Sequence, residues 1–316
     1  MSVTITTRVM TDADLEPVLD LMKASLGETP LLSRTRELFE WKHIDNPFGR
    51  SIVLVAEADD RLVGLRAFMR WDLTTTNGET IHCVRAVDTA THPDYQRLGI
   101  FRRLTLEAVE EARAQGVDMI FNTPNAKSGP GYLKMGWTEV GKIDVLIRPK
   151  APLLTGDRTA GLEPAHALAG QPREVTLEGV HDRAPRGLRT VRSDRYFKWR
   201  FTMHPTARYF QVEKDDSFAV VRPNVRSGRT ELLIADLFGP NLRSVTRQSI
   251  RMARTAYVGA SFSQGSPERS ACVRSGLMLV PWLSPMTLMA RPLKDLTVEV
   301  SSLRAWDLSL GDLELL

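Results

Sequence analysis

The sequence contains little cysteine, no long apolar run and no block of basic residues, and each absence excludes a class of protein. Cys83 and Cys272 are the only cysteines among 316 residues, so there is no disulfide framework. No apolar stretch approaches the roughly 20 residues of a membrane-spanning helix. The first residues lack a basic start followed by an apolar stretch. We therefore expect no secretory signal and a cytoplasmic protein.

The overall amino-acid composition is typical of a globular protein. Hydrophobic residues make up 42% and charged residues 25%, which excludes a disordered chain or a fibrous repeat. The length predicts two domains of ordinary size. The net charge is +4, and only nine of the 42 basic residues are lysine. Because these charges are spread along the chain, they favour a small phosphate-bearing ligand over nucleic acid.

Hydrophobic periodicity and turn signals predict the element order β-α-α-β-β-β-α-β-α-β for the first half. This order mixes an antiparallel meander with crossover helices, so the expected fold class is α/β (α+β) with one parallel pairing. The predicted strands are 3–9, 52–58, 62–73, 80–91, 117–122 and 137–147, and the predicted helices are 11–22, 33–44, 98–115 and 128–135.

The second half repeats this pattern after an Ala-, Gly- and Pro-rich segment, 151–190, which predicts a linker or insertion. Phe197 to Arg200 repeats the spacing of Phe39 to Lys42, and Asp236 stands where the first half has Asp88. We interpret this as a diverged internal duplication, although chance similarity of a few aromatic residues is the alternative. The predicted domains are 1–150 and 191–316. The predicted second-half elements are strands 207–213, 218–222 and 232–237, a helix 242–257, then a short strand, a short helix ending at Gly276 and a strand through Met289.

The most informative segment leads from the 80–91 strand into the 98–115 helix. Its Gly99 lets the backbone approach a ligand closely, and the first-turn N–H groups of the helix lack internal partners. The helix dipole adds partial positive charge at the same point, and Arg97, Arg102 and Arg103 add more. These features favour a pyrophosphate site, whereas an ordinary connection with one glycine is the alternative.

Three segments resemble one known family. Residues 96–101, Gln-Arg-Leu-Gly-Ile-Phe, resemble the glutamine/arginine-x-x-glycine-x-glycine/alanine signature of the GNAT superfamily of acetyl-CoA-dependent acyltransferases. Tyr132 to Trp137 is similar to its tyrosine-x-x-x-glycine-aromatic ending, and Asn125 precedes Tyr132 by seven residues. The resemblance covers 3–149 strongly and 190–290 weakly. Phe101 departs from the signature, which has a small residue there.

The resemblance implies a duplicated GNAT fold, a mixed and mostly antiparallel sheet with flanking helices, and acetyl-CoA (coenzyme A) as the cofactor. Ala90 and Thr91 would pair with the pantetheine arm by backbone, and Asn125 would hydrogen-bond it. Tyr132 would lie beside the thioester sulfur and act as the general acid. The residues expected to contact the cofactor are Ala90, Thr91, Gln96, Arg97, Leu98, Gly99, Ile100, Phe101, Arg102, Asn125 and Ser128.

A base is also useful, because the attacking amine is mostly protonated at neutral pH. Asp88 is the first candidate, either as this base or as the group that holds the ammonium; a carboxylate paired with Arg85 is the alternative. Weaker candidates are His82, His92 and Glu139. The six histidines include no pair at ligand spacing with cysteine, so we predict no metal site.

The second half lacks the phosphate loop, and residues 271–276 replace the tyrosine segment. We therefore expect a non-catalytic copy that forms a wall of the acceptor pocket. The predicted function is N-acetyltransfer to a primary amine of a small molecule, such as an amino sugar, amine metabolite or antibiotic. A protein lysine or N-terminal acetyltransferase and a non-catalytic acyl-CoA-binding protein are the alternatives. We expect neither nucleic acid nor membrane as a partner, and a homodimer is left open.

Overall fold

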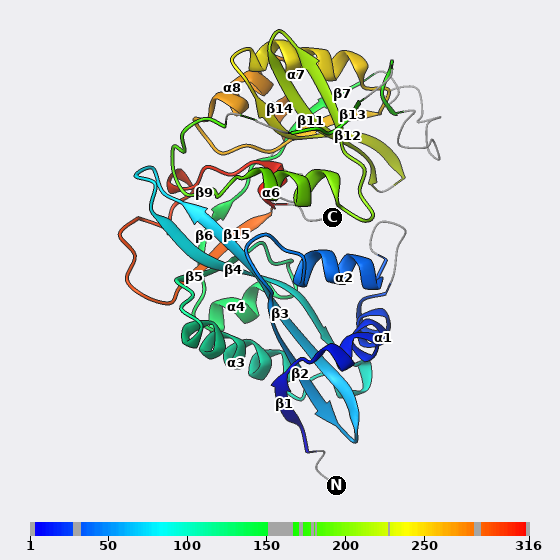
Figure 1. Ribbon diagram of the computed structural model, residues 1–316, viewed down its shortest axis with the longest axis vertical. Helices are drawn as coiled ribbons and strands as arrows, with labels where there is room; N and C mark the ends of the chain where they lie inside the picture. Colours follow the sequence, from blue (N-terminus) through cyan, green and yellow to red (C-terminus); the bar gives the residue numbers. More distant parts are fainter. Residues whose placement is uncertain are drawn as a thin grey trace.

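The computed structural model describes residues 4–27, 33–150, 167–170, 173–177, 180, 182–226, 228–280 and 286–313. These residues form two mixed β-sheets, one below the other in Figure 1, with helices packed against them. The first strand, Thr6–Val9, lies at the far end of the lower part. The predicted fold class is confirmed. About half of the segment predicted as a linker or insertion lies outside the described residues, and its described part contributes two short strands, Arg173–Glu174 and Arg189–Thr190.

The first sheet has the spatial order β1-β2-β3-β4-β5-β15-β6, with β9 paired to β3. Its β4 and β5 run parallel and are joined by a crossover helix, as parallel neighbours require. The continuous apolar sequence of β2 follows from burial of both its faces. The strands are β1 (Thr6–Val9), β2 (Ile52–Ala58), β3 (Arg61–Thr74), β4 (Thr80–Thr91), β5 (Met119–Asn122), β6 (Thr138–Lys142), β9 (Arg189–Thr190) and β15 (Thr287–Pro292).

The second sheet has the order β14-β7-β13-β12-β11-β10-β8. Its β12 and β13 also run parallel, so its centre has the same arrangement as β4 and β5 in the first sheet. The strands are β7 (Leu146–Pro149), β8 (Arg173–Glu174), β10 (Phe210–Lys214), β11 (Ser217–Arg226), β12 (Arg229–Phe238), β13 (Tyr257–Ala260) and β14 (Met278–Leu279).

The helices begin and end at local signals. Thr35 caps α2, because its side chain accepts a hydrogen bond from the backbone N–H of Leu38. The α-helices are α1 (Leu15–Leu26), α2 (Arg36–His43), α3 (Ile100–Ala114), α4 (Gly129–Lys134), α6 (Asp194–Phe197), α7 (Leu242–Met252), α8 (Pro267–Arg274) and α9 (Leu310–Leu313). The short 3₁₀ or π turns are η1 (Asp12–Asp14), η2 (Pro93–Tyr95), η4 (Lys198–Thr202) and η5 (Leu303–Ala305).

Three predicted elements differ from the observed ones. The helix predicted over 242–257 ends at Met252, because the chain becomes extended at Ala253 and then enters β13. The single strand predicted over 137–147 is two strands, β6 and β7, which lie in different sheets. The strand predicted through Met289 likewise divides into β14 and β15. In both cases each strand pairs with a strand from the other half of the chain. Local periodicity gives no information about such distant pairing.

The two halves therefore exchange one strand each. The β7 strand follows β6 in the chain but pairs with β13 and β14 of the second sheet. The β15 strand comes from the second half but lies between β5 and β6 in the first sheet. Each sheet is completed only by a strand from the other half, so the two halves form one interdependent structure.

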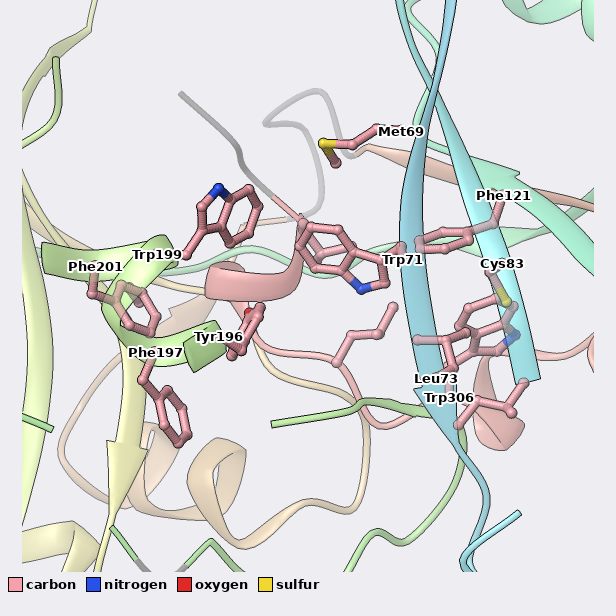
Figure 2. Close-up of a cluster of buried hydrophobic side chains, with 14 of the residues drawn as sticks. Met69, Trp71, Leu73, Cys83, Phe121, Tyr196, Phe197, Trp199, Phe201 and Trp306 are labelled. Atoms are coloured by element: carbon pink, nitrogen blue, oxygen red, sulfur yellow. The ribbon is translucent and has the colours of Figure 1, made fainter. Parts of the chain in front are cut away.

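Aromatic side chains from both halves fill the space between the sheets (Figure 2). The Trp41 and Trp199 rings stack with centroids 4.6 Å apart. Each indole N–H donates to the backbone carbonyl of the other tryptophan at 2.8 Å. Figure 2 also shows Trp71 and Phe121 of the first sheet in this cluster. This shared core fixes one sheet against the other.

Candidate active site

The site begins where β4 and β5 separate. Pairing between these parallel strands runs from Cys83 to Arg85 of β4, whereas β4 continues against β3 as far as Thr91. Among the described strands, the last six residues of β4 therefore have no partner on the β5 side. Ala90 and Thr91, which were expected to pair with the pantetheine arm, lie in this unpaired part of β4.

The loop before α3 has the geometry of an anion site. Arg97 and Gly99 both have positive φ angles, +67° and +78°, which turn the backbone sharply just before the helix. Since α3 begins at Ile100, its first-turn N–H groups have no intrahelical acceptor and face outward with the positive end of the helix dipole. The side chains of Arg97 and Arg102 add positive charge at the same place.

This loop and the end of β4 enclose a cavity of about 420 Å³. Of the nine residues from Ala90 to Arg102 that were predicted to bind the cofactor, Leu98 alone is not part of its wall, and the Leu98 side chain is 53% exposed. The wall consists of Ser25, Leu26, Thr89, Ala90, Thr91, Gln96, Arg97, Gly99, Ile100, Phe101 and Arg102.

A second and larger cavity, about 580 Å³, lies on the other side of Thr89 between the two sheets. Asn125, Ser128 and Tyr132 line it, as does Asp88. Thr89 lines both cavities, so the two are neighbours along the open half of β4. The predicted phosphate-binding residues and the predicted acid thus lie along one path.

Tyr132 is held firmly at the wall of the larger cavity. Its side chain comes from α4, is only 3% exposed, and lies between the rings of Phe101 and Trp137 at centroid distances of 5.7 and 5.0 Å. The Nη2 of Arg66 donates a hydrogen bond to the phenol oxygen at 2.6 Å. Phe101, the departure from the signature, therefore packs edge-on against Tyr132.

Asn125 begins the turn that positions α4. Its side-chain oxygen accepts hydrogen bonds from the backbone N–H groups of Lys127 and Ser128, both at 3.0 Å. The Ser128 hydroxyl lies 3.1 Å from the same oxygen. The Asn125 carboxamide oxygen is therefore used within the loop, and the remaining Nδ2 group is the part of this side chain that is suited to bind a ligand carbonyl.

Asp88 is surrounded by basic groups. Its carboxylate accepts from Lys42 Nζ at 3.0 Å and lies 2.9 Å from His43 Nε2 and 3.9 Å from Arg34. Although burial acts in the opposite direction, Lys42 and His43 hold the pKa of Asp88 well below its usual range. Burial lowers the pKa of His43. The alternative role of Asp88, a pairing with Arg85, is not seen among the described ion pairs, since Arg85 donates to backbone carbonyls of α9.

The weaker base candidates lie away from this cavity. His82 is exposed and lies 3.1 Å from Asp72, and His92 contacts Arg61 outside the cavity wall. The Glu139 side chain on β6 is exposed. None of these three residues lines the larger cavity. Within the described ranges, no group of three or more His, Cys, Asp or Glu side chains is arranged to hold a metal ion.

The second half supplies the opposite wall of the larger cavity. Glu231 of β12 and Tyr257 of β13 are register partners, and the Tyr257 hydroxyl donates to the Glu231 carboxylate at 2.5 Å. Asn224 Nδ2 and Arg226 Nε donate to the same carboxylate at 2.6 and 3.1 Å. Burial and the Glu231 carboxylate raise the pKa of Tyr257 above its usual range.

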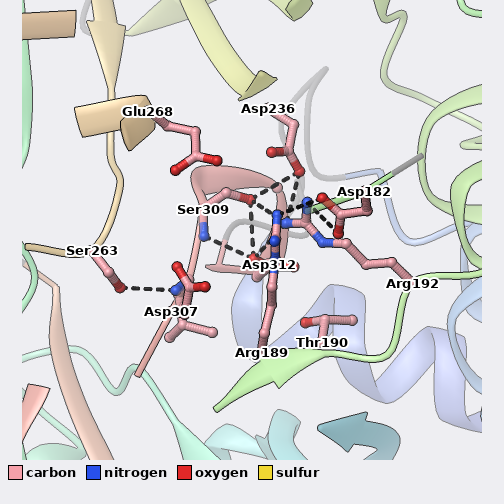
Figure 3. Close-up of polar contacts among 12 residues, drawn as sticks. Asp182, Arg189, Thr190, Arg192, Asp236, Ser263, Glu268, Asp307, Ser309 and Asp312 are labelled. Atoms are coloured by element: carbon pink, nitrogen blue, oxygen red, sulfur yellow. Dashed lines mark hydrogen bonds and ion pairs between the residues drawn. The ribbon is translucent and has the colours of Figure 1, made fainter. Parts of the chain in front are cut away.

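The short helix α9 contributes Leu310 and Leu313 to the wall of this cavity. Arg85 donates to the backbone carbonyls of Asp312 and Leu313, and burial lowers its pKa to about 10. Figure 3 shows the charged network that includes Asp312 of α9. The Nη2 atom of Arg192 lies 2.8 Å from an Asp236 carboxylate oxygen and 3.0 Å from one of Asp312. Burial raises the pKa of Asp236 to about 6.

Several residues at this site were not singled out for a site role by sequence reasoning. Lys42 appeared only as the last position of a repeated aromatic motif, and its contact with Asp88 depends on α2 packing beside β4. Arg66 and Glu231 belong to no recognisable motif. Their positions follow from strand register and from the packing of one sheet on the other, so no local signal marks them.

Comparison with known proteins agrees with this geometry. Residues 6–140 match the model of the "Acetyltransferase (GNAT) domain" family. A search of curated sequences gives no significant match. No helix in the described parts is long and apolar enough to cross a membrane.

Solved structures share the fold over most of the chain. A probable N-acyltransferase from Enterococcus faecalis V583 is 13% identical, with a TM-score of 0.60, and the alignment covers 92% of this chain and 73% of that one. A GCN5-related N-acetyltransferase from Kribbella flavida is 15% identical, with a TM-score of 0.58 and coverage of 92% and 71%. Eis1 from Mycobacterium abscessus is 14% identical, with a TM-score of 0.58 and coverage of 92% and 73%. Residues 6–140 are thus similar to a GNAT acetyltransferase domain, and these solved structures share the fold of most of the chain.

Proposed function

We propose that this protein transfers an acetyl group from acetyl-CoA to a primary amine of a small molecule. The observation that supports this most directly is the position of Thr89, which lines both the cavity at the α3 loop and the cavity that contains Tyr132. One elongated ligand can therefore reach from the loop to the phenol. Acetyl-CoA has this shape, with a pyrophosphate at one end and a thioester at the other.

The loop residues fit the pyrophosphate. The N–H groups of the first turn of α3, preceded by Arg97 and Gly99, provide a concave set of donors with positive charge around it. The open edge of β4 at Ala90 and Thr91 offers backbone groups to the pantetheine amides, and Asn125 Nδ2 offers a further donor. Bound acetyl-CoA supplies the acetyl thioester that the amine attacks.

Tyr132 is the proposed general acid. Its hydroxyl can give a proton to the departing sulfur, which contributes typically 10²–10⁴-fold in rate for such groups. Asp88 is a poor base in this arrangement, because Lys42 and His43 favour its ionised form. We assign Asp88 instead to holding Lys42 in the wall of the cavity and to pairing with the buried His43.

The acceptor is proposed to enter from the second half. The larger cavity has a volume of about 580 Å³, within the range of small-molecule sites, and both sheets and α9 surround it. This enclosure favours a small amine over a lysine on a folded protein. Glu231 and Tyr257 lie on the wall supplied by the second half, so they are suited to bind the polar part of the acceptor.

The second half is proposed to be a diverged copy of the first without its own phosphate loop. Three features support the duplication: the parallel strand pair at the centre of each sheet, the reciprocal exchange of β7 and β15, and the mutual hydrogen bonds of Trp41 and Trp199. The proposed division is 1–150 and 191–316, with the connecting segment between them.

Calorimetric titration with acetyl-CoA, followed by thiol-release assays across a panel of small amines, tests the proposal. We expect acetyl-CoA binding and turnover of at least one small amine. Y132F should bind acetyl-CoA normally and lose kcat roughly 10²-fold or more. E231Q should raise KM for the amine and leave KM for acetyl-CoA within twofold. Absence of acetyl-CoA binding at millimolar concentration would refute the cofactor assignment, and turnover of protein substrates alone would refute the acceptor assignment.

A further inference from the structure

Arg66 is a fully buried cation beside the proposed acid. It lies on β3 opposite Thr89 of β4, the residue that lines both cavities, and its side chain has no exposed surface. Its Nη2 donates to the Tyr132 phenol oxygen at 2.6 Å. Among the described residues, its Nε and Nη1 have no hydrogen-bond partner.

In the described part of the chain, the charge of Arg66 is met by aromatic faces and not by a carboxylate. The centre of the guanidinium lies 4.9 Å from the ring centroid of Phe68, 5.8 Å from that of Phe101 and 5.3 Å from that of Tyr132. No ion pair of Arg66 with a described acidic residue is formed. A buried cation without a counter-ion is costly, because the interior solvates charge poorly. Among the described residues, the phenol oxygen of Tyr132 is therefore the one hydrogen-bond acceptor of this guanidinium.

We propose that Arg66 is the positioning residue for Tyr132 and provides the counter-charge for the phenolate that proton donation leaves behind. The hydrogen bond from Nη2 occupies one lone pair of the phenol oxygen, so the hydroxyl proton must point in another direction. The phenolate in turn strengthens the same contact, because a hydrogen bond between two charged groups is stronger than one to a neutral phenol. This inference rests on the proposed acid role of Tyr132.

The proton and electron balance is complete without a further reactant. The C–N bond forms as the amine attacks the thioester carbon, and the C–S bond breaks with its electron pair on sulfur. The Tyr132 hydroxyl gives its proton to that sulfur, and the phenolate pairs with Arg66. The amine nitrogen releases a proton when it becomes the amide nitrogen. The phenolate takes up this proton, directly or through water.

A double-mutant cycle of Arg66 and Tyr132 tests the inference. R66M removes the donor and the charge and keeps an apolar side chain of similar length. We expect R66M to lower kcat about 10- to 100-fold with KM for acetyl-CoA within twofold. In the Y132F background the same substitution should change kcat by less than twofold, since Arg66 would have no phenolate to stabilise. R66K retains the charge and should recover at least part of the lost kcat.

A second buried arginine–tyrosine pair provides a matched control. Arg200 Nη1 donates to the Tyr209 hydroxyl at 2.7 Å, and neither residue lines the cavity. Y209F should leave kcat within twofold. If R66M proves unfolded in thermal melts, R66K and R66Q complete the cycle with Y132F.

The outcomes separate the two proposals. If Y132F retains the kcat of the wild-type protein, the acid role itself is wrong. If Y132F loses kcat but the Arg66 variants lower kcat by the same factor with and without the hydroxyl, only the inference about Arg66 is overturned. If Y209F lowers kcat as much as the Arg66 variants do, any buried arginine–tyrosine contact affects the rate. This result would also overturn the inference about Arg66.

Discussion

Replacing Asp88 with asparagine separates a structural carboxylate from a catalytic base. The Asp88 side chain is 12% exposed and balances Lys42 and His43 at 3.0 and 2.9 Å. Removal of one partner of a buried ion pair costs about 3–5 kcal/mol, because the other charge stays buried without compensation. For a domain of 150–250 residues each kcal/mol lowers Tm by about 2–4 °C, so D88N should melt roughly 6–20 °C lower.

Urea denaturation and thermal melts at pH 7 measure this loss. The double variant D88N/K42M should lose less stability than D88N alone, since it leaves no unpaired ammonium. The matched control is D45N, which removes an exposed carboxylate near the same helix and should stay within about 0.5 kcal/mol of wild type. A D88N protein with unchanged stability and no turnover would refute this reasoning and restore Asp88 as the base.

The remaining predictions concern pH dependence and backbone packing. Burial raises the pKa of Asp236 from 3.8 to about 6, so its contribution to stability is fully present below about pH 4 and is lost as the pH rises to about 6. Relative to wild type, D236N should therefore gain roughly 2 kcal/mol between pH 4 and pH 7 in urea titrations; an unchanged difference would contradict the raised pKa. A Cβ on Gly64 would lie 2.5 Å from Ile100 Cγ2, at the start of α3. G64A should thus weaken acetyl-CoA binding in calorimetry by displacing the phosphate loop, whereas G78A in an exposed turn, where no atom lies within 4 Å of the new Cβ, should leave it unchanged. Equal affinities for both variants would argue against a preformed loop.

The sequence by itself determined the elements of the first half as far as α4, and the loop before α3. The reason is that these features are local: periodicity places strands and helices, and a glycine before a helix places free N–H groups whatever surrounds them. Gln96, Arg97 and Gly99 therefore appear in the sequence as a unit and remain one in the structure. The position of Tyr132 on a short helix next to Asn125 is local in the same sense.

Tertiary structure alone decided the partners of the charged residues and the membership of the sheets. Asp88 and Lys42 are 46 residues apart in the chain, and nothing near either of them predicts the pair. The exchange of β7 and β15 depends on backbone hydrogen bonds between segments that are distant in the chain. Any extended strand can form such bonds, so the tertiary packing of the two sheets selects which strands pair. The wall that contains Glu231 exists for the same reason, since it depends on how the second sheet packs against the first.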